Sequence, residues 1–184
     1  FQTGLAFYET KLMGIEDTWT FVLTATMTFL SVCQYPIVNK LAPKIGKKKM
    51  IITGFFGYAL VFLITFLCGK GLYWGFIVAV CASVPMAILG ILPQACVADV
   101  AELSRLETGE DRSGMFFAAR TFAFKMGQAL AMVVFTSITV SGTPGSYRAT
   151  AAVAFVTCVT GACLFFLYNE KMILSRIREI KGEE

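Results

Sequence analysis

Four long runs without a charged side chain constrain this chain more than any other feature. They extend over Thr18–Asn39, Met50–Gly69, Gly71–Ala98 and Ala149–Asn169. Each run approaches or exceeds the roughly 20 residues that an α-helix needs to cross a bilayer core of about 30 Å. Because lipid offers no hydrogen-bond partners, the backbone of such a run must satisfy itself, as a helix does. The sequence therefore predicts an all-α membrane protein that crosses the bilayer several times.

The composition of the 184 residues favours this class over others. Hydrophobic residues make up 57% of the chain and charged residues 15%, whereas a soluble domain is usually about a quarter charged. The net charge of +4 is not arranged as a basic surface with interleaved aromatic residues, so nucleic acid is not an expected partner. The chain has no histidine, and its six cysteines lie in or beside apolar runs without a CxxC pair. We therefore predict neither a metal site nor a disulfide.

The spacing of the apolar runs predicts how the chain is divided. We expect a transmembrane bundle over 1–169 and an amphipathic tail over 170–184, where isoleucines recur at helical spacing among charges. Because the first residues resemble the end of a spanning helix, an N-terminal bundle is expected to precede them. Within 1–169, a partial helix and then five full helices are predicted over 1–13 and about 18–38, 50–67, 72–98, 113–139 and 149–168.

Lysine and arginine residues in the short loops predict the orientation. Eleven lie in the junction around Lys47, in the loop after the third full helix and in the tail, whereas three lie in the segments on the opposite side. Cytoplasmic loops carry an excess of these residues. We therefore expect the C-terminus to lie in the cytoplasm.

The fourth full helix contains two cations, Arg120 and Lys125. Lys125 lies twelve residues after Ser113, about 18 Å along the helix and near the bilayer midplane. A charge there costs about 2.5–3.5 kcal/mol on insertion scales, and the other full helices contain no acid. Lys125 must therefore face a water-filled cavity, pair with an acid outside this chain, or be deprotonated, unless the helix is shifted and Lys125 is interfacial. Arg120 lies about 140° around the helix and nearer the cytoplasm, where we expect it to reach the surface or pair at a gate.

Polar residues recur every three to four positions on two of the helices. In the first full helix they are Thr24, Thr28, Ser31 and Tyr35, together with Thr20. In the fourth, Thr121, Lys125 and Gln128 begin a similar stripe. Helical spacing places each set on one face, so both helices are predicted to line an aqueous cavity. The alternative for the first stripe is that its hydroxyls bond back to carbonyls of their own helix.

The loop after the third full helix, "ADVAELSRLETGEDRSG", leads into the helix that carries Lys125. This sequence resembles the glycoside–pentoside–hexuronide:cation symporter family, a melibiose-carrier-like branch of the major facilitator superfamily. The family pattern at this junction is similar to A-D-x-x-D-Y-G-E-x-K-T-G-x-R-x-E-G, followed by a lysine in the next helix. Residues that match it, allowing an acid swap at Glu102 and a displacement of one position at Arg112, are Asp99, Glu102, Thr108, Gly109, Arg112, Gly114 and Lys125.

The resemblance covers nearly the whole chain and implies the C-terminal bundle of a major facilitator fold. The partial helix would be the end of the seventh helix, and the five full helices the eighth to the twelfth. The implied function is secondary active transport, in which a sugar or glycoside is carried together with Na⁺ or H⁺ by alternating access. A multi-pass protein of a bacterial inner membrane is implied as well, and no enzymatic activity is expected, because no nucleophile lies with a base.

The same resemblance assigns roles to residues. Lys125, Thr121 and Gln128 would couple substrate to cation, and Thr24, Thr28, Ser31 and Tyr35 would line the cavity. Asp99, Glu102, Gly109 and Arg112 would form a cytoplasmic gate loop. No cofactor is implied, and the coupling cation would be bound mainly by the absent N-terminal bundle. The implied partners are the sugar, the cation, the lipid bilayer and that six-helix bundle.

Two other functions remain open from the sequence. A lysolipid-type carrier of the same superfamily is one, because phenylalanines such as Phe116, Phe117, Phe122 and Phe124 suit an acyl chain as well as they suit lipid-facing surface. A membrane scaffold that transports nothing is the other, although it gives no reason for the cost of Lys125. The 184 residues by themselves are not expected to transport.

Overall fold

A computed structural model of the chain describes residues 17–67, 72–140 and 142–181. Regular structure within these ranges is entirely helical, and five of the helices are long and apolar enough to cross a membrane. The prediction of an all-α, multi-pass membrane protein is therefore confirmed. The partial helix predicted at 1–13 lies outside the described residues. The helices are α2 (Asp17–Ile45), α3 (Lys47–Leu67), α4 (Leu72–Thr108), α5 (Ser113–Thr139), α6 (Pro144–Phe165) and α7 (Glu170–Lys181).

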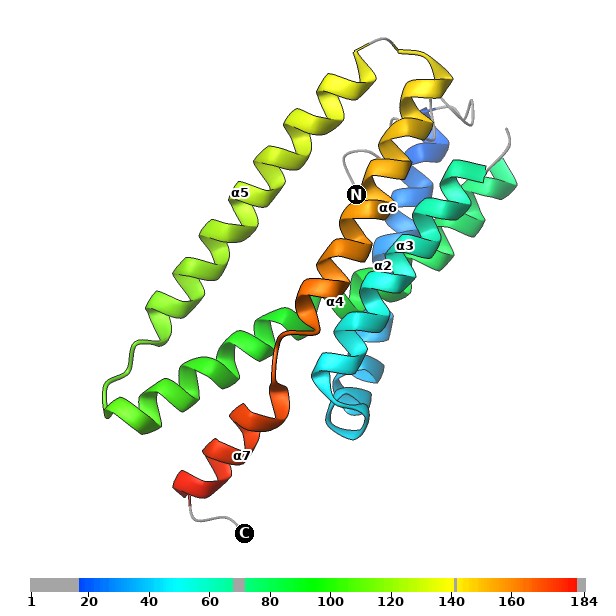
Figure 1. Cartoon of the computed structure of the whole chain (residues 1–184). Helices are drawn as coiled ribbons and strands as arrows, with labels where there is room; N and C mark the ends of the chain where they lie inside the picture. Colours follow the sequence, from blue (N-terminus) through cyan, green and yellow to red (C-terminus); the bar gives the residue numbers. More distant parts are fainter. Residues whose placement is uncertain (1–16, 68–71, 141, 182–184) are drawn as a thin grey trace.

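Four helices pack together while α5 stands apart (Figure 1). α3 packs against α4 and α6, and α2 packs against α4. The second half of α4 leaves the bundle at an angle (Figure 1), after the part of the helix that contains Pro85 and Pro93. Proline removes an intrahelical hydrogen bond and crowds the preceding turn, which bends a helix. α5 then runs back from the far end of α4 and carries no buried residue among those described.

Small residues allow the helices of the bundle to approach closely. A Cβ atom added to Gly54 of α3 would lie 2.9 Å from Cγ2 of Ile88 on α4, and one added to Gly57 would lie 3.2 Å from Cβ of Pro85. On the other side of α3, a Cβ at Gly161 of α6 would lie 3.1 Å from the ring of Phe55. In lipid, where no hydrophobic effect drives helices together, such close contact is a main source of association.

The interior of the bundle consists of two apolar clusters stacked along its length. One joins residues of α2, α3, α4 and α6, and the other joins α2, α3 and α4. The first cluster contains Leu23, Met27, Val61, Val78, Ala79, Ala82 and Ala151. The second contains Val38, Ala42, Met50, Ile51, Ala87, Ile88, Leu92 and Cys96.

The helices extend beyond the uncharged runs at one end of the molecule. α2 continues to Ile45, α3 begins at Lys47 and α4 continues to Thr108, whereas helices were predicted over about 18–38, 50–67 and 72–98. Outside hydrocarbon a helix can continue through lysine and glutamate, which are good helix formers and whose charges reach water. The breaks come where glycine has a positive φ, +97° at Gly46 and +72° at Gly109.

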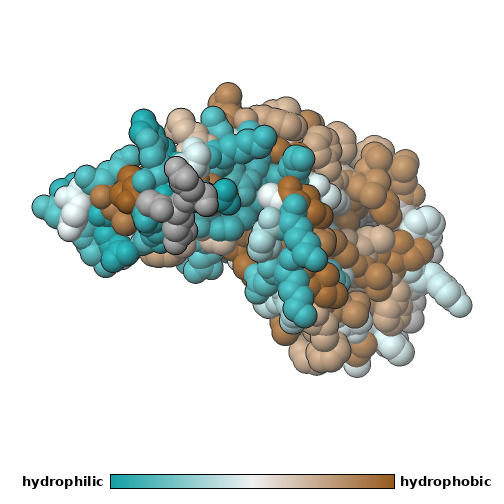
Figure 2. Space-filling view, turned by 90° about the horizontal axis from the view of Figure 1, so that it is seen from below, coloured by the Kyte–Doolittle hydropathy of each residue, from teal (hydrophilic) through white to brown (hydrophobic). Residues whose placement is uncertain are grey.

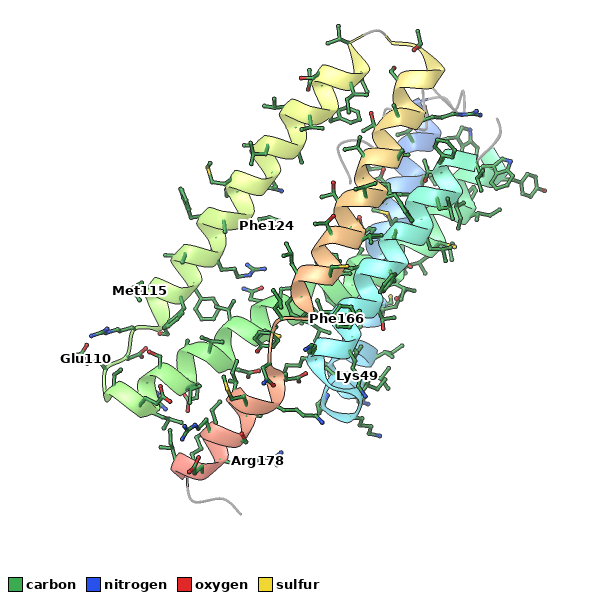
Figure 3. The ribbon with its side chains drawn as sticks, viewed as in Figure 1. Lys49, Glu110, Met115, Phe124, Phe166 and Arg178 are labelled. Atoms are coloured by element: carbon green, nitrogen blue, oxygen red, sulfur yellow. The ribbon has the colours of Figure 1, made fainter. Side chains whose placement is uncertain are left out.

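The α2–α3 junction, the α4–α5 loop and α7 lie at the same end, which we call the charged end (Figure 1). Lys49, Glu110 and Arg178 mark these three segments in Figure 3. Figure 2 views this end and shows hydrophilic residues gathered on it, with hydrophobic surface to one side. The α5–α6 turn lies at the opposite end, so successive long helices cross from one end to the other.

We predict that Gly54→Leu destabilises the bundle whereas Gly127→Leu does not. At Gly54 a side chain meets Ile88 and Leu89, but nothing lies within 4 Å of the position at Gly127 on α5. Overpacking of this kind costs about 1–3 kcal/mol, so the midpoint of thermal unfolding in detergent should fall by several degrees. Equal midpoints for the two variants would contradict the tight α3–α4 contact.

Candidate functional site

The polar face of α5 is open to its surroundings. Thr121, Lys125 and Gln128 are all exposed. Lys125 lies near the middle of the 27-residue helix and makes no ion pair with any residue in the described ranges. The hydroxyl of Thr121 donates to the carbonyl of Phe117 at 2.8 Å, which leaves its oxygen lone pairs as acceptors. These three residues therefore form a polar stripe that α2, α3, α4 and α6 do not cover.

Arg120 lies on a different side of α5. Figure 3 shows Phe124 on the side that faces the other helices and Met115 on the opposite side. The guanidinium carbon of Arg120 is 5.9 Å from the centre of the Phe124 ring, so Arg120 shares the inward side. Lys125 is about 140° away around the axis. The two cations of α5 therefore serve different surfaces.

The predicted stripe on α2 is divided between surface and interior. Thr24 and Thr28 line an open groove of about 540 Å³ among Phe and Val side chains, and the Thr28 hydroxyl donates to the carbonyl of Thr24 at 2.9 Å. Ser31 has no exposed surface, and its hydroxyl makes no hydrogen bond in the structure. Tyr35 packs against the second apolar cluster. Thr24 and Thr28 therefore lie on an open surface, whereas Thr20 and Ser31 are buried and Tyr35 is partly buried. Thr28 adopts the back-bonded alternative.

One polar contact inside the bundle was not anticipated from the sequence. The side-chain amide of Gln34 on α2 donates to the hydroxyl of Ser83 on α4 at 2.9 Å, and Ser83 donates to the carbonyl of Val80. In the sequence, Gln34 is an amide side chain within an apolar run. Such a residue in a spanning helix indicates an interhelical hydrogen bond.

The start of α3 is the centre of a charged cluster at the charged end. The ammonium of Lys47 is 2.8 Å from Oδ1 of Asp99 on α4, and both side chains are about four-fifths buried. The Glu170 carboxylate at the start of α7 accepts hydrogen bonds from the backbone N–H groups of Lys47 and Lys48, at 2.8 and 2.7 Å. These N–H groups have no partner within α3, and the helix dipole favours an anion there. Glu170 thereby joins the C-terminal segment to a helix 123 residues earlier.

The other end of α7 is also attached. Lys181 lies 3.2 Å from Oε1 of Glu102 on α4, and Arg105 lies 3.1 Å from the other oxygen of the same carboxylate. α7 therefore spans from the start of α3 to the projecting half of α4. Lys47, Glu170 and Lys181 were not among the predicted site residues. Their signal in the sequence is a charged residue at a helix end, which does not identify the partner.

The loop between α4 and α5 is held by local contacts. Gly109 ends α4, and Arg112 lies 2.6 Å from the carboxylate of Glu110. Asp111 accepts a hydrogen bond from the backbone N–H of Ser113 at 3.0 Å, and hydrogen bonds from Ser113 hold the pKa of the Asp111 carboxyl below its usual range.

The four residues predicted to form a gate loop do not come together. Asp99 contacts α3 and Glu102 contacts α7, whereas Gly109 and Arg112 lie on the loop itself. Glu102 also lines a groove of about 300 Å³ between the end of α4 and the start of α5. The acids are therefore engaged within this chain in the conformation seen here.

A comparison with protein families identifies what the chain is similar to. The sequence profile of the family MFS_2, described as MFS/sugar transport protein, matches residues 1–177. The matched range includes α2 to α6 and most of α7. Searches of curated proteins and of solved structures gave no significant match.

We predict that Glu170→Ala loosens α7 while Glu179→Ala leaves it attached. The first change removes the acceptor for two N–H groups of α3, whereas Glu179 pairs with the exposed Arg176 of its own helix. Loss of a helix cap costs about 0.5–2 kcal/mol, or about 2- to 30-fold in an opening equilibrium. Hydrogen exchange of 170–181 should accelerate by that factor in Glu170→Ala, and unchanged exchange would refute the attachment.

Proposed function

The chain belongs to the MFS/sugar transport protein family, and we propose that it is the C-terminal half of a cation-coupled symporter for a sugar or glycoside. The predicted membership of the major facilitator superfamily is confirmed by the profile match over 1–177. The multi-pass helical fold agrees with a transporter. The proposal is that the chain forms the C-terminal half of the fold, that transport is coupled to a cation, and that the substrate is a sugar or glycoside.

The observation that carries the proposal is the position of Lys125. It lies at mid-length of a membrane-length helix, is exposed and has no acid partner in the described ranges. A cation at that depth must be hydrated or neutralised. A cavity between this bundle and a second bundle would supply water for hydration and acids for neutralisation. Transporter sites lie at such an interface, near the midplane.

In the proposed mechanism, two bundles rock about the midplane and open the site to each side in turn. The polar stripe of α5 faces the cavity, where the free lone pairs of Thr121 and the amide of Gln128 bind sugar hydroxyls. Carboxylates of the N-terminal bundle bind Na⁺ or H⁺. Occupation of those carboxylates changes the electrostatic field at the Lys125 ammonium, and this couples the cation to the sugar.

The charged end is proposed to be cytoplasmic, because eleven of the Lys and Arg residues lie in its segments and three lie opposite. Asp99, Glu102 and Arg112 are at this end in ion pairs within the chain. When the cytoplasmic side closes or opens, we expect these pairs to exchange for contacts with the N-terminal bundle. Gly109 allows the loop between them to turn.

We predict that Lys125→Val in the full-length protein abolishes cation-driven accumulation of substrate. The ammonium carries the coupling, so uptake by proteoliposomes of labelled galactosides, xylosides or glucuronides should fall at least about tenfold with a Na⁺ or H⁺ gradient. Lys49→Gln, an exposed cation at the charged end, should leave uptake unchanged.

Two results would redirect the proposal. Retained gradient-driven accumulation in Lys125→Val would remove the central role of this residue. Uptake of a labelled lysophospholipid with no uptake of any sugar would identify a lysolipid carrier instead, for which the apolar groove beside Thr24 and Thr28 offers a surface.

A further inference from the structure

An apolar groove lies on the side of α5 that the transport stripe does not use. It is bounded by α4, α5, the last residue of α6 and Tyr168, and it has a volume of about 480 Å³. Its lining is formed almost entirely by apolar side chains, with Pro93 and Val97 on α4 and Phe116 on α5. Two polar groups interrupt this lining, the guanidinium of Arg120 and the hydroxyl of Tyr168.

Arg120 brings a permanent positive charge into this groove. Its neighbour is the ring of Phe124, at 5.9 Å, and it forms no ion pair with a residue in the described ranges. The sequence contains no acid from Ser113 to Asn169. A guanidinium presents five donors and matches phosphate oxygens in a two-point contact. The groove is therefore complementary to an anion at Arg120. The carboxylates of Asp99 and Glu170 act on Tyr168 at the other side, and both are engaged at the start of α3.

Tyr168 provides a second polar group. Its hydroxyl is shielded from solvent and lies beside the thiol of Cys96, which also lines the groove. The ring is fixed by stacking on Phe165, with centroids 5.3 Å apart. A buried donor of this kind is normally satisfied in a folded protein. The thiol sulfur is only a weak acceptor, so the Tyr168 hydroxyl can donate to a stronger one in the groove.

The groove has a cationic end at Arg120 and an apolar end deeper in the membrane. Arg120 is seven residues after Ser113, where α5 begins at the charged end, so it lies about 10 Å along the helix. A long arginine side chain can place its charge toward the membrane interface from that depth. The apolar walls continue past it to Ala123 on α5 and Pro93 on α4. An occupant should therefore be an amphiphile with an anion at the interface and a hydrocarbon chain below.

We propose that this groove binds one anionic glycerophospholipid from the leaflet at the charged end. Arg120 holds the phosphate, and the Tyr168 hydroxyl donates to a phosphate or ester oxygen. One acyl chain lies against Pro93, Val97 and Phe116. The lipid is a structural component rather than the substrate, because Lys125 and its stripe face another side of α5. It fills the groove between α5 and α4, beside the end of α6.

The test uses full-length protein in detergent, titrated with phosphatidylglycerol or phosphatidylcholine and examined by native mass spectrometry. The wild type should retain one phosphatidylglycerol in preference to phosphatidylcholine. Arg120→Gln should weaken retention about tenfold or more, the usual effect of losing a hydrogen bond to a charged group. Lys49→Gln changes an exposed cation at the same end, outside the groove, and should bind as the wild type does.

Two further variants separate the lipid from other occupants. Ala119→Trp keeps Arg120 but fills the groove, and it should also lose the bound lipid. Tyr168→Phe keeps the ring and should weaken retention several-fold, through loss of one hydrogen bond. Glycerol phosphate, which has no acyl chain, should not compete.

Each contrary result overturns the assignment. These results are unchanged retention in Arg120→Gln or Ala119→Trp, equal retention of the two lipids, and displacement by glycerol phosphate. Absence of any retained lipid also overturns it, since another part of the protein then covers the groove. None of these outcomes depends on which solute the protein transports.

Discussion

The absence of hydrogen-bonding solvent in hydrocarbon is the constraint on which the rest of this structure depends. It forces the backbone of each apolar run into a helix, and it removes the hydrophobic effect as a force between helices. Association then requires close contact, which Gly54, Gly57 and Gly161 allow on both sides of α3. The four-helix bundle of α2, α3, α4 and α6 is the result, and it provides a rigid support for the more exposed α5.

Because of the same constraint, polar side chains at membrane depth need a hydrogen-bond partner, a counter-charge or water. Gln34 and Ser83 satisfy one another between α2 and α4. Lys125 and Arg120 find no ion-pair partner in the described ranges, and they lie about 140° apart around one helix. We connect the first with a cavity for solutes and the second with a lipid headgroup. On this view α5 is the element between the transported solute and the membrane.

At the charged end, where water is available, ion pairs and hydrogen bonds to charged groups hold the segments together. α7 is attached at its start by Glu170, which caps α3, and at its end by Lys181, which contacts Glu102 on α4. Asp99 joins the same cluster through Lys47. These contacts connect the α2–α3 junction, α4 and α7. The more exposed pair of Lys181 with Glu102 costs little to break, whereas the pair of Lys47 with Asp99 is largely buried.

Local features of the sequence predicted the five membrane-length helices found in the described ranges, and the position of Lys125 near the middle of α5. Run length decides whether a segment spans, and position along a run decides depth. Hydropathy does not determine the rotation of a helix about its axis or its neighbours. Ser31 and Tyr35 share a predicted face with Thr24 and Thr28, yet only packing decided that Ser31 is fully buried and that Tyr35 is partly buried against the second apolar cluster. The tertiary structure alone joined Glu170 to Lys47 and Lys48, and Tyr168 to the groove of Arg120, because those contacts unite segments far apart in the chain.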